Sequence, residues 1–340
     1  MRSRAIRVAR SEGETARRAL LDAGKLRTDL RIRVDDGEVV LPVGEGSLPV
    51  AGAVVEEEFI RQGEPEAARR YQDLVSLPPD RRALLPRAFD VIGDIVLVRI
   101  PDELESDGPA IGDALLRFVP GARLVGADGG VHGTDRRRSL RALAGKGGWR
   151  THHRENGIEI EVDVEQAYFS PRLAREHARV AEAVRPGETV YDLCCGVGPF
   201  SLAIARDARA RRIVAVDHNA AATDLLRASL ARMAPSVPVD VVEDDVERFL
   251  KSAGPADRAI LNLPLQGIKY LPSVSRVVRP GGSIHYYEVT ERAELDARAM
   301  TIMDRVGGPR EWVIRDHREV HAYSPSSDLR SYTFERRGDA

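Results

Sequence analysis

The second half of the chain alternates strands and helices in a regular order, and this alternation constrains the fold more than any other feature. From residue 170 onward, short apolar runs suited to strands alternate with amphipathic runs suited to helices. Such connections cross over one face of a sheet, so they place successive strands parallel. We therefore expect an α/β fold with a mostly parallel sheet, its strands at residues 189–193, 212–217, 237–243, 259–263 and 283–289, followed by strand-like runs at 311–314 and 331–335.

The first half of the chain divides into two smaller segments. Residues 1–68 are expected to form a small α/β module, and residues 69–86, which contain Pro78-Pro79, a linker. Residues 87–165 are expected to form an α+β domain ahead of the α/β domain at 166–340.

Local signals predict the elements of these segments. In the module, a capping-box pattern beginning at Ser11 opens a helix that ends at Gly24, and Asp35-Asp36-Gly37 joins a hairpin. The helix that begins after Ser170-Pro171 carries an apolar face. The remaining elements expected here are strands at 5–8, 30–34, 38–43, 89–100, 122–125 and 157–164 and a helix at 109–118.

Composition limits the class of protein. The chain has 340 residues, is 43% hydrophobic and 31% charged, and has a formal net charge of −2, as expected for a globular protein. It has no apolar run of about 18 residues and no recognisable secretory signal, so neither a membrane span nor export is expected. Its two cysteines are adjacent and its eight histidines are scattered, so we expect a cytoplasmic protein with no metal site.

A cluster of basic residues lies between His132 and Arg154. Only Asp135 opposes it in this stretch. Such a run forms either an ordinary solvated surface or a binding face for a polyanion such as RNA. Its members are Arg136, Arg137, Arg138, Arg141, Lys146, Arg150 and Arg154.

A glycine-containing loop directly follows the first strand of the α/β domain. Gly196 and Gly198 permit a tight turn close to a ligand, and Asp217 ends the next strand, 21 residues after Gly196, where it can accept from ribose hydroxyls. A dinucleotide site would require a third glycine, and the chain has Ser201 there. Adenosylmethionine instead requires an acid before the glycines, and Asp192 supplies it. We therefore favour adenosylmethionine.

Several neighbours of this loop are further candidates for the cofactor site. Asp244 and Asp245 follow the third strand, where Asp245 can accept from an adenine amino group. Cys194 and Cys195 are expected to pack as small residues, with Cys194 beside the cofactor. Asn262-Leu263-Pro264 ends the fourth strand and should border the same crevice, where an amide can meet the edge of a planar base.

The motifs of the chain together resemble one known family, the archaeal and eukaryotic type of tRNA (guanine-37-N1)-methyltransferase. The resemblance covers nearly the whole chain and implies a class I, Rossmann-like methyltransferase domain preceded by two small α/β RNA-binding domains. The sheet of that domain is expected to be mostly parallel, with an antiparallel C-terminal strand. The matching motifs are His153-Arg154-Glu155-Asn156-Gly157, Tyr168-Phe169-Ser170-Pro171-Arg172-Leu173 with Glu176, the loop from Asp192 to Ser201, Asn262-Leu263-Pro264, and Gly281-Gly282-Ser283-Ile284-His285-Tyr286-Tyr287.

The resemblance implies roles for individual residues. Glu176 would be the general base that removes the N1 proton of guanine, with a raised pKa, and Arg138 would stabilise the charge that develops on O6. Asn262 would orient the base and contact the cofactor, Pro264 would shape the pocket, and Tyr168 would lie near both ligands. The arginines expected to bind substrate are Arg136, Arg137, Arg141, Arg150, Arg154 and Arg172.

The expected partner is tRNA, contacted at its anticodon loop and, through the N-terminal module, at a distant point, by a monomeric enzyme. Four alternatives remain open at this stage. A related wyosine-pathway enzyme transfers the aminocarboxypropyl group of the same cofactor, although Asn-Leu-Pro favours methyl transfer, and some relatives also methylate a wyosine precursor. A nicotinamide-dependent oxidoreductase and a non-catalytic tRNA-binding protein are the alternatives from other classes.

Overall fold

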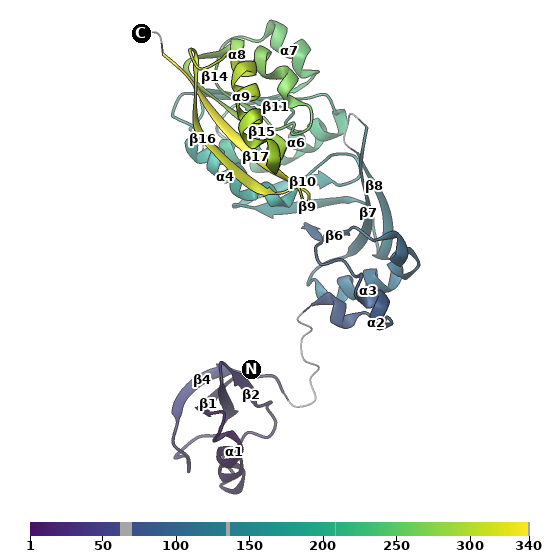
Figure 1. Ribbon diagram of the computed structural model, residues 1–340, viewed down its shortest axis with the longest axis vertical. Helices are drawn as coiled ribbons and strands as arrows, with labels where there is room; N and C mark the ends of the chain where they lie inside the picture. Colours follow the sequence, from purple (N-terminus) through teal and green to yellow (C-terminus); the bar gives the residue numbers. More distant parts are fainter. Residues whose placement is uncertain (62–69, 134–136, 208, 339–340) are drawn as a thin grey trace. The chain divides into compact units, whose positions relative to one another are not determined.

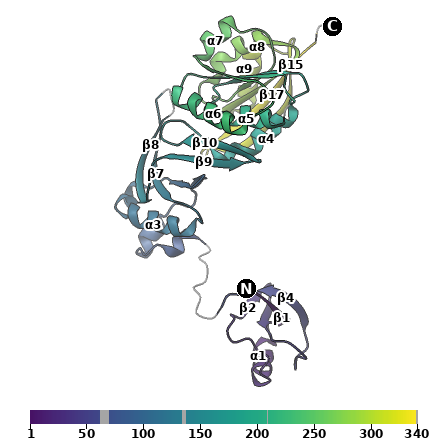
Figure 2. The same ribbon diagram turned by 180° about the vertical axis from the view of Figure 1, so that it is seen from behind.

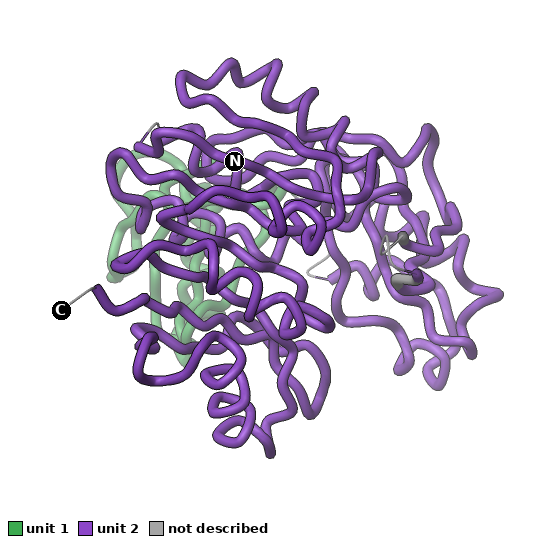
Figure 3. Tube along the Cα trace, turned by 90° about the horizontal axis from the view of Figure 1, so that it is seen from above, with its two compact units in different colours: residues 1–69 green, residues 70–340 purple. Residues whose placement is uncertain are grey.

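The computed structural model describes residues 1–61, 70–133, 137–207 and 209–338 of the chain. The chain divides into two compact units, Met1–Arg69 and Arg70–Ala340, which are coloured separately in Figure 3. Among the described residues, the first unit holds one sheet and the second holds three.

The first unit is a four-stranded antiparallel sheet with one helix packed on it. Ile6, Leu20 and Leu41 are buried between them, and the predicted Asp-Gly turn is confirmed, with φ of 47° at Asp36 and 86° at Gly37. The predicted capping box is wrong, because the N-cap is Glu12 and its side chain makes no cap hydrogen bond. The elements are β1 (Arg2–Ala9), α1 (Gly13–Asp22), β2 (Arg33–Asp35), β3 (Glu38–Pro42) and an unpredicted strand, β4 (Ala53–Glu58), in the sheet order β2-β3-β1-β4.

The second unit begins with a smaller sheet of order β5-β6-β7-β8, on which helix α3 packs. The single strand expected at 89–100 is instead a hairpin, because Gly93 adopts a φ of 57° and reverses the chain. Part of the basic run forms strand β8 of this sheet, and its last residues lie in strand β9 (Arg150–Glu155) of a separate two-stranded sheet. The elements are β5 (Asp90–Ile92), β6 (Ile95–Val98), α3 (Gly108–Phe118), β7 (Leu124–His132) and β8 (Arg137–Gly145).

The segment expected as a linker carries structure of its own. It contains a short 3-10 helix (Tyr71–Leu74) and α2 (Pro79–Arg82). Tyr71, Val75 and Leu85 are buried in the same cluster as Ile111 and Leu115 of α3. Residues 70–86 therefore belong to the core of the β5–β8 sheet, and the linker prediction is wrong for them.

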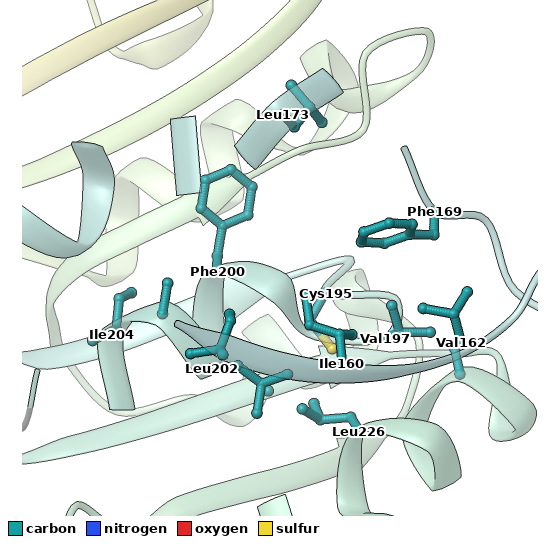
Figure 4. Close-up of a cluster of buried hydrophobic side chains, with 14 of the residues drawn as sticks. Ile160, Val162, Phe169, Leu173, Cys195, Val197, Phe200, Leu202, Ile204 and Leu226 are labelled. Carbon is teal, nitrogen blue, oxygen red and sulfur yellow. The ribbon is translucent and has the colours of Figure 1, made fainter. Parts of the chain in front are cut away.

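The hairpin of β9 (Arg150–Glu155) and β10 (Ile158–Asp163) packs against the helices of the largest sheet. Figure 4 shows Ile160 and Val162 of β10 in one buried cluster with Val197 and Phe200. The Glu161 N–H also donates to Ser229 Oγ on α6 at 2.9 Å. The hairpin therefore shares its core with the α/β domain.

The largest sheet has the strand order β13-β12-β11-β14-β15-β17-β16. The first five strands pair in parallel, and β17 runs antiparallel to both of its neighbours. The predicted α/β class with a mostly parallel sheet and an antiparallel C-terminal strand is confirmed. The elements are α4 (Ala174–Ala183), β11 (Thr189–Leu193), α5 (Pro199–Asp207), β12 (Arg212–Asp217), α6 (Ala220–Met233), β13 (Val239–Glu243), α7 (Val246–Ser252), β14 (Ala256–Leu261), α8 (Leu271–Val277), β15 (Val278–Glu291), an unpredicted helix α9 (Leu295–Val306), β16 (Trp312–Ala322) and β17 (Ser327–Arg336).

Helices cover both faces of this sheet. α7, α8 and α9 lie on the face toward the viewer in Figure 1, and α4, α5 and α6 on the face seen in Figure 2. Each face has its own buried cluster, so the carboxyl edge of the parallel strands is where loops can meet a ligand. Among the described residues, no helix is both long and apolar enough to cross a membrane.

Candidate active site

The glycine loop leaves β11 in a conformation that favours glycine. Three of its residues have positive φ, with values of 60° at Cys194, 56° at Gly196 and 74° at Gly198. The Gly196 N–H donates to Asp217 Oδ2 at 2.7 Å, so the end of β12 holds the loop. Burial raises the pKa of both neighbouring thiols, Cys194 and Cys195, which therefore stay protonated and pack as small residues.

Asp192 lies beneath this loop and is almost fully buried. Its Oδ2 accepts from the backbone N–H of Ser201 at 3.1 Å and from the Ser201 hydroxyl at 2.6 Å. Burial raises the pKa of Asp192 to about 6, although the bonds from Ser201 oppose the shift. Within the described structure its Oδ1 is buried without a hydrogen-bond partner, so one acceptor remains for a donor from a ligand.

The other predicted cofactor acids hold loop backbone. Asp217 accepts from the N–H groups of Gly196 and Asn219 and is mostly buried. Asp245 is the N-cap of α7, where its Oδ1 accepts from the N–H groups of Glu247 and Arg248. Asp244 accepts from the Asp245 N–H at 2.7 Å and pairs with Arg248. These carboxylates shape the loops at the ends of β12 and β13.

Asn262-Leu263-Pro264 lies level with the glycine loop. Leu261 pairs in register with Leu193 of β11, so Asn262 and Cys194 leave neighbouring parallel strands at the same height. The Leu263 carbonyl accepts from the Gly267 N–H at 2.7 Å, which closes the turn after the motif. Asn262 Oδ1 is buried and, among the described residues, has no hydrogen-bond partner. The structure thus brings the two predicted motifs together and leaves an acceptor between them.

Glu176 lies on the first turn of α4, and only 6% of it is exposed. Its carboxylate accepts from Arg179 at 2.7 Å and from the Tyr287 hydroxyl at 2.9 Å, and Arg318 lies 3.6 Å away. Burial alone raises the pKa of Glu176, but the bonds from Arg179 and Tyr287 and the charge of Arg318 outweigh it, so the pKa lies below its ordinary value. The expectation of a raised pKa is wrong.

The partners of Glu176 are residues that sequence reasoning missed. Arg179 lies three residues along the same helix, a spacing that brings side chains together and could have been noticed. Tyr287 and Arg318 come from β15 and β16, and only the strand register places them there. The adjacent residue Tyr286 pairs with Leu261, so Tyr287 is level with Asn262 on the neighbouring strand.

Arg138 reaches the segment that leads into α4. Its guanidinium pairs with Asp128, donates to the Phe169 carbonyl at 3.1 Å, and lies 5.3 Å from the centre of the Tyr168 ring. Strand β8 therefore places Arg138 next to Tyr168.

The other predicted substrate arginines are divided among several surfaces. Each of these arginines whose side chain the structure describes has an acidic partner, and this partner reduces the local excess of positive charge. Arg136 lies outside the described residues, and Arg137 is described only as part of the β8 backbone. The pairs are Arg141–Glu105 at 2.5 Å, Arg150–Glu161 at 2.5 Å, Arg154–Glu159 at 2.9 Å and Arg172–Asp90 at 2.9 Å.

A cavity of about 590 Å³ lies between the β5–β6 turn and strand β9. Arg123, Arg150 and Arg154 line it together with His152 and His153. Within the parts of the chain that the structure describes, no cluster of three His, Cys, Asp or Glu side chains could hold a metal ion.

Replacing Gly198 tests whether the loop requires glycine. A Cβ at Gly198 would lie 2.3 Å from Leu226 Cδ1, and the backbone there has a φ of 74°. We expect Gly198→Ala to lower the free energy of unfolding by about 2–4 kcal/mol, from left-handed strain plus overpacking. Gly187→Ala is the control, because Gly187 has a φ of 84° with no atom within 4 Å of its Cβ position. Equal losses in urea denaturation would contradict the predicted contact with Leu226.

Comparison with known proteins finds matches over most of the chain. Residues 151–314 match the TRM5/TYW2 methyltransferase domain, residues 72–148 the TYW2 N-terminal domain, and residues 5–48 the tRNA methyltransferase 5 N-terminal domain. The chain is 35% identical to the tRNA (guanine(37)-N(1))-methyltransferase Trm5b of Pyrococcus abyssi over 287 residues, which cover 83% of each protein.

Two solved structures are similar over almost their full lengths. The crystal structure of Trm5b from Pyrococcus abyssi matches with a TM-score of 0.75 and 30% identity, over 98% of this chain and 99% of that one. The complex of aTrm5 with tRNALeu matches with a TM-score of 0.73 and 26% identity, over 97% and 99%. The chain belongs to the Trm5 family of adenosylmethionine-dependent tRNA (guanine(37)-N1)-methyltransferases.

Proposed function

We propose that this protein transfers a methyl group from adenosylmethionine to N1 of guanosine 37 in tRNA, with Glu176 as the general base. The observation that carries the proposal is the buried Glu176 carboxylate, held by Tyr287 on the strand next to the one that ends at Asn262. This arrangement supports a base beside the site where the two sequence motifs meet. The lowered pKa of Glu176 keeps its carboxylate ionised, so Glu176 is ready to accept a proton at neutral pH.

The residues around the glycine loop fit adenosylmethionine. Asp192 Oδ1 and Asn262 Oδ1 are buried acceptors without partners among the described residues, suited to the amino group of its methionine part and to donors of the cofactor or guanine. We infer that Asp217, Asp244, Asp245 and Tyr168 contribute to the same site, together with Cys194 and the two glycines. When bound, adenosylmethionine supplies an electrophilic methyl group.

The protein's own groups then handle the proton and the charge. Guanine N1 has no free lone pair until its proton leaves, and Glu176 accepts that proton. As the N1 proton leaves, negative charge grows on O6, and the Arg138 guanidinium stabilises this charge. Asn262 orients the base and Pro264 shapes the pocket, so that N1 faces the methyl group.

We further propose that the basic residues predicted to bind substrate hold the anticodon arm. Where the structure describes the ion pairs of these residues, the arginine side chain is exposed, so the pairs contribute little and can open toward phosphates. The set is Arg136, Arg137, Arg141, Arg150, Arg154 and Arg172, with the first unit contacting a distant part of the tRNA. Two unpaired cysteines support a reducing, cytoplasmic setting, and we propose that the enzyme acts as a monomer.

Mass spectrometry of tRNA incubated with the enzyme and adenosylmethionine tests the proposal. We expect one added methyl group on guanosine 37 and none on a tRNA carrying adenosine at that position. An aminocarboxypropyl adduct would instead assign the chain to the wyosine-pathway reaction. No change in tRNA mass would contradict methyl transfer.

A further inference from the structure

A buried bridge of ionisable side chains connects strand β9 to helix α4. His177 Nδ1 on α4 lies 2.6 Å from Glu155 Oε1 on β9, and the exposed fractions of these two residues are 1% and 7%. On the other side of the carboxylate, His153 Nε2 lies 3.8 Å from Glu155 Oε2. The proposed chemistry assigns no role to these three side chains.

Each end of the bridge reaches a functional part of the molecule. At one end, the Gly93 N–H donates to His153 Nδ1 at 3.2 Å, and His153 lines the cavity bounded by Arg123 and Arg150. At the other end, His177 directly follows Glu176 in α4. A continuous set of contacts therefore runs from the β5–β6 turn to the proposed base.

Aromatic contacts make a second connection at the α4 end. His177 meets the Phe200 ring edge to face, with centroids 4.6 Å apart, and Phe200 lies 5.6 Å from the Tyr287 ring. The Tyr287 hydroxyl in turn donates to Glu176. His177 thus constrains Glu176 both through the α4 backbone and through the side chain that hydrogen-bonds the carboxylate.

The surroundings of the bridge are apolar. Ile158, Val180 and Phe200 belong to the buried cluster around it. Glu155 Oε2 and His177 Nε2 are themselves buried without hydrogen-bond partners in the described structure. Burying hydrogen-bonded polar side chains costs desolvation, and apolar residues of similar volume often stabilise a fold as well or better. Such a pair provides a directional bond between two elements, which an apolar contact does not provide.

We propose that Glu155 is a positioning residue for methyl transfer, acting through His177 to hold α4 where Glu176 can reach guanine N1. This inference rests on the proposed role of Glu176. Strand β9 carries two of the proposed RNA-binding arginines, and the Glu155–His177 bond connects this strand to the helix that carries the base. In this role Glu155 acts through His177 and not by contact with the substrate or the cofactor.

Single-turnover methylation at saturating tRNA and adenosylmethionine measures the effect. We expect Glu155→Ala to lower the rate of methyl transfer about 100-fold, the scale of a 1 Å misplacement, with both dissociation constants unchanged. Glu155→Gln retains an oxygen that can accept from His177 Nδ1, so it should recover to within about fivefold of the wild type. Glu161→Ala is the matched control, because Glu161 is equally buried on the same hairpin and pairs with arginines rather than with α4.

A second pair of variants covers the case in which Glu155→Ala does not fold, which its melting curve will show. His177→Leu removes the bond to Glu155, whereas His177→Asn places an amide N–H near the Nδ1 position. The same contrast is expected, with a large loss for Leu and recovery for Asn. Wild-type rates for the Ala and Leu variants, or losses confined to ligand binding, would overturn the positioning role.

Combining the bridge with the base separates this inference from the proposed function. If Glu155 acts only through Glu176, then Glu155→Ala in a Glu176→Gln background should cost no more than about twofold further. A full 100-fold additional loss would overturn the inference while leaving the base intact. Turnover by Glu176→Gln alone would instead contradict the proposed base, whatever Glu155 does.

Discussion

Glu176→Gln is expected to lower kcat for guanosine 37 methylation by about 10²–10⁴-fold, the usual contribution of a positioned general base. Glutamine has nearly the same shape and keeps an oxygen for the Tyr287 hydroxyl, but it cannot accept the N1 proton. Calorimetry with adenosylmethionine and filter binding with tRNA should give wild-type dissociation constants, because the change affects only the reacting step.

The control for this variant lies on the same helix. Glu182 is exposed on the last turn of α4, so Glu182→Gln changes the charge of the helix equally without touching the site. We expect it to retain wild-type kcat. Turnover by Glu176→Gln within about threefold of the wild type would remove the base from the mechanism.

The pH dependence of kcat follows from the environment of Glu176. The base must be ionised, and Arg179, Tyr287 and Arg318 together hold its pKa below the ordinary value despite burial. The fall in kcat at acid pH that protonation of Glu176 causes should therefore lie below about pH 4.3, the unperturbed pKa of glutamate. With the folded pKa depressed, its contribution to folding stability is present above that pH and is lost as the pH falls through the folded pKa. A limb from Glu176 near pH 6 would contradict these contacts.

Local sequence patterns predicted most of the parallel sheet because each of its strands is a continuous apolar run bounded by turn residues. They failed where one residue's backbone conformation decides the outcome. Gly93 turns the run at 89–100 into a hairpin, and the Gly93-Asp94 pair is a hairpin signal that was outweighed by the apolar residues on both sides of it. Likewise, Tyr71 becomes buried only because α3 packs over it.

The site divides in the same way. The glycine loop and Asn262-Leu263-Pro264 are contiguous motifs, and the parallel register brings them together as expected. The direction of the Glu176 pKa could not be predicted, since it depends on Tyr287, which is 111 residues away, and on Arg318. Burial by itself would have raised that pKa, and the predicted direction considered burial without these partners.

The basic run shows a limit of counting charges along a sequence. Against Asp135 alone the run looks strongly positive, but Arg141, Arg150 and Arg154 find partners on other segments, namely Glu105, Glu161 and Glu159. Any phosphate must compete with these acids, so the salt dependence of tRNA binding reports how many pairs open.

Asp217→Ala is expected to weaken adenosylmethionine binding by about 100-fold or more. The carboxylate accepts from the N–H groups of Gly196 and Asn219, and hydrogen bonds to a charged group contribute about 1.5–3 kcal/mol each. Its removal leaves two loop N–H groups without their acceptor and lets the glycine loop leave the conformation that the cofactor requires. Calorimetry measures the dissociation constant, and tRNA affinity serves as the internal reference because the loop lies outside the proposed RNA surface.

Two further variants separate the charge of Asp217 from its geometry. Asp217→Asn keeps one acceptor oxygen in place, so its affinity should lie between those of the wild type and the alanine variant. Asp224→Ala, at an exposed acid of α6 whose carboxylate pairs with Arg227, should bind as the wild type does. If Asp217→Ala bound within about threefold of the wild type, the loop would be held by its own backbone conformation rather than by the end of β12. If only the asparagine variant bound normally, the two N–H groups would need an acceptor but not a charge, and the carboxylate's contribution would be to loop geometry alone.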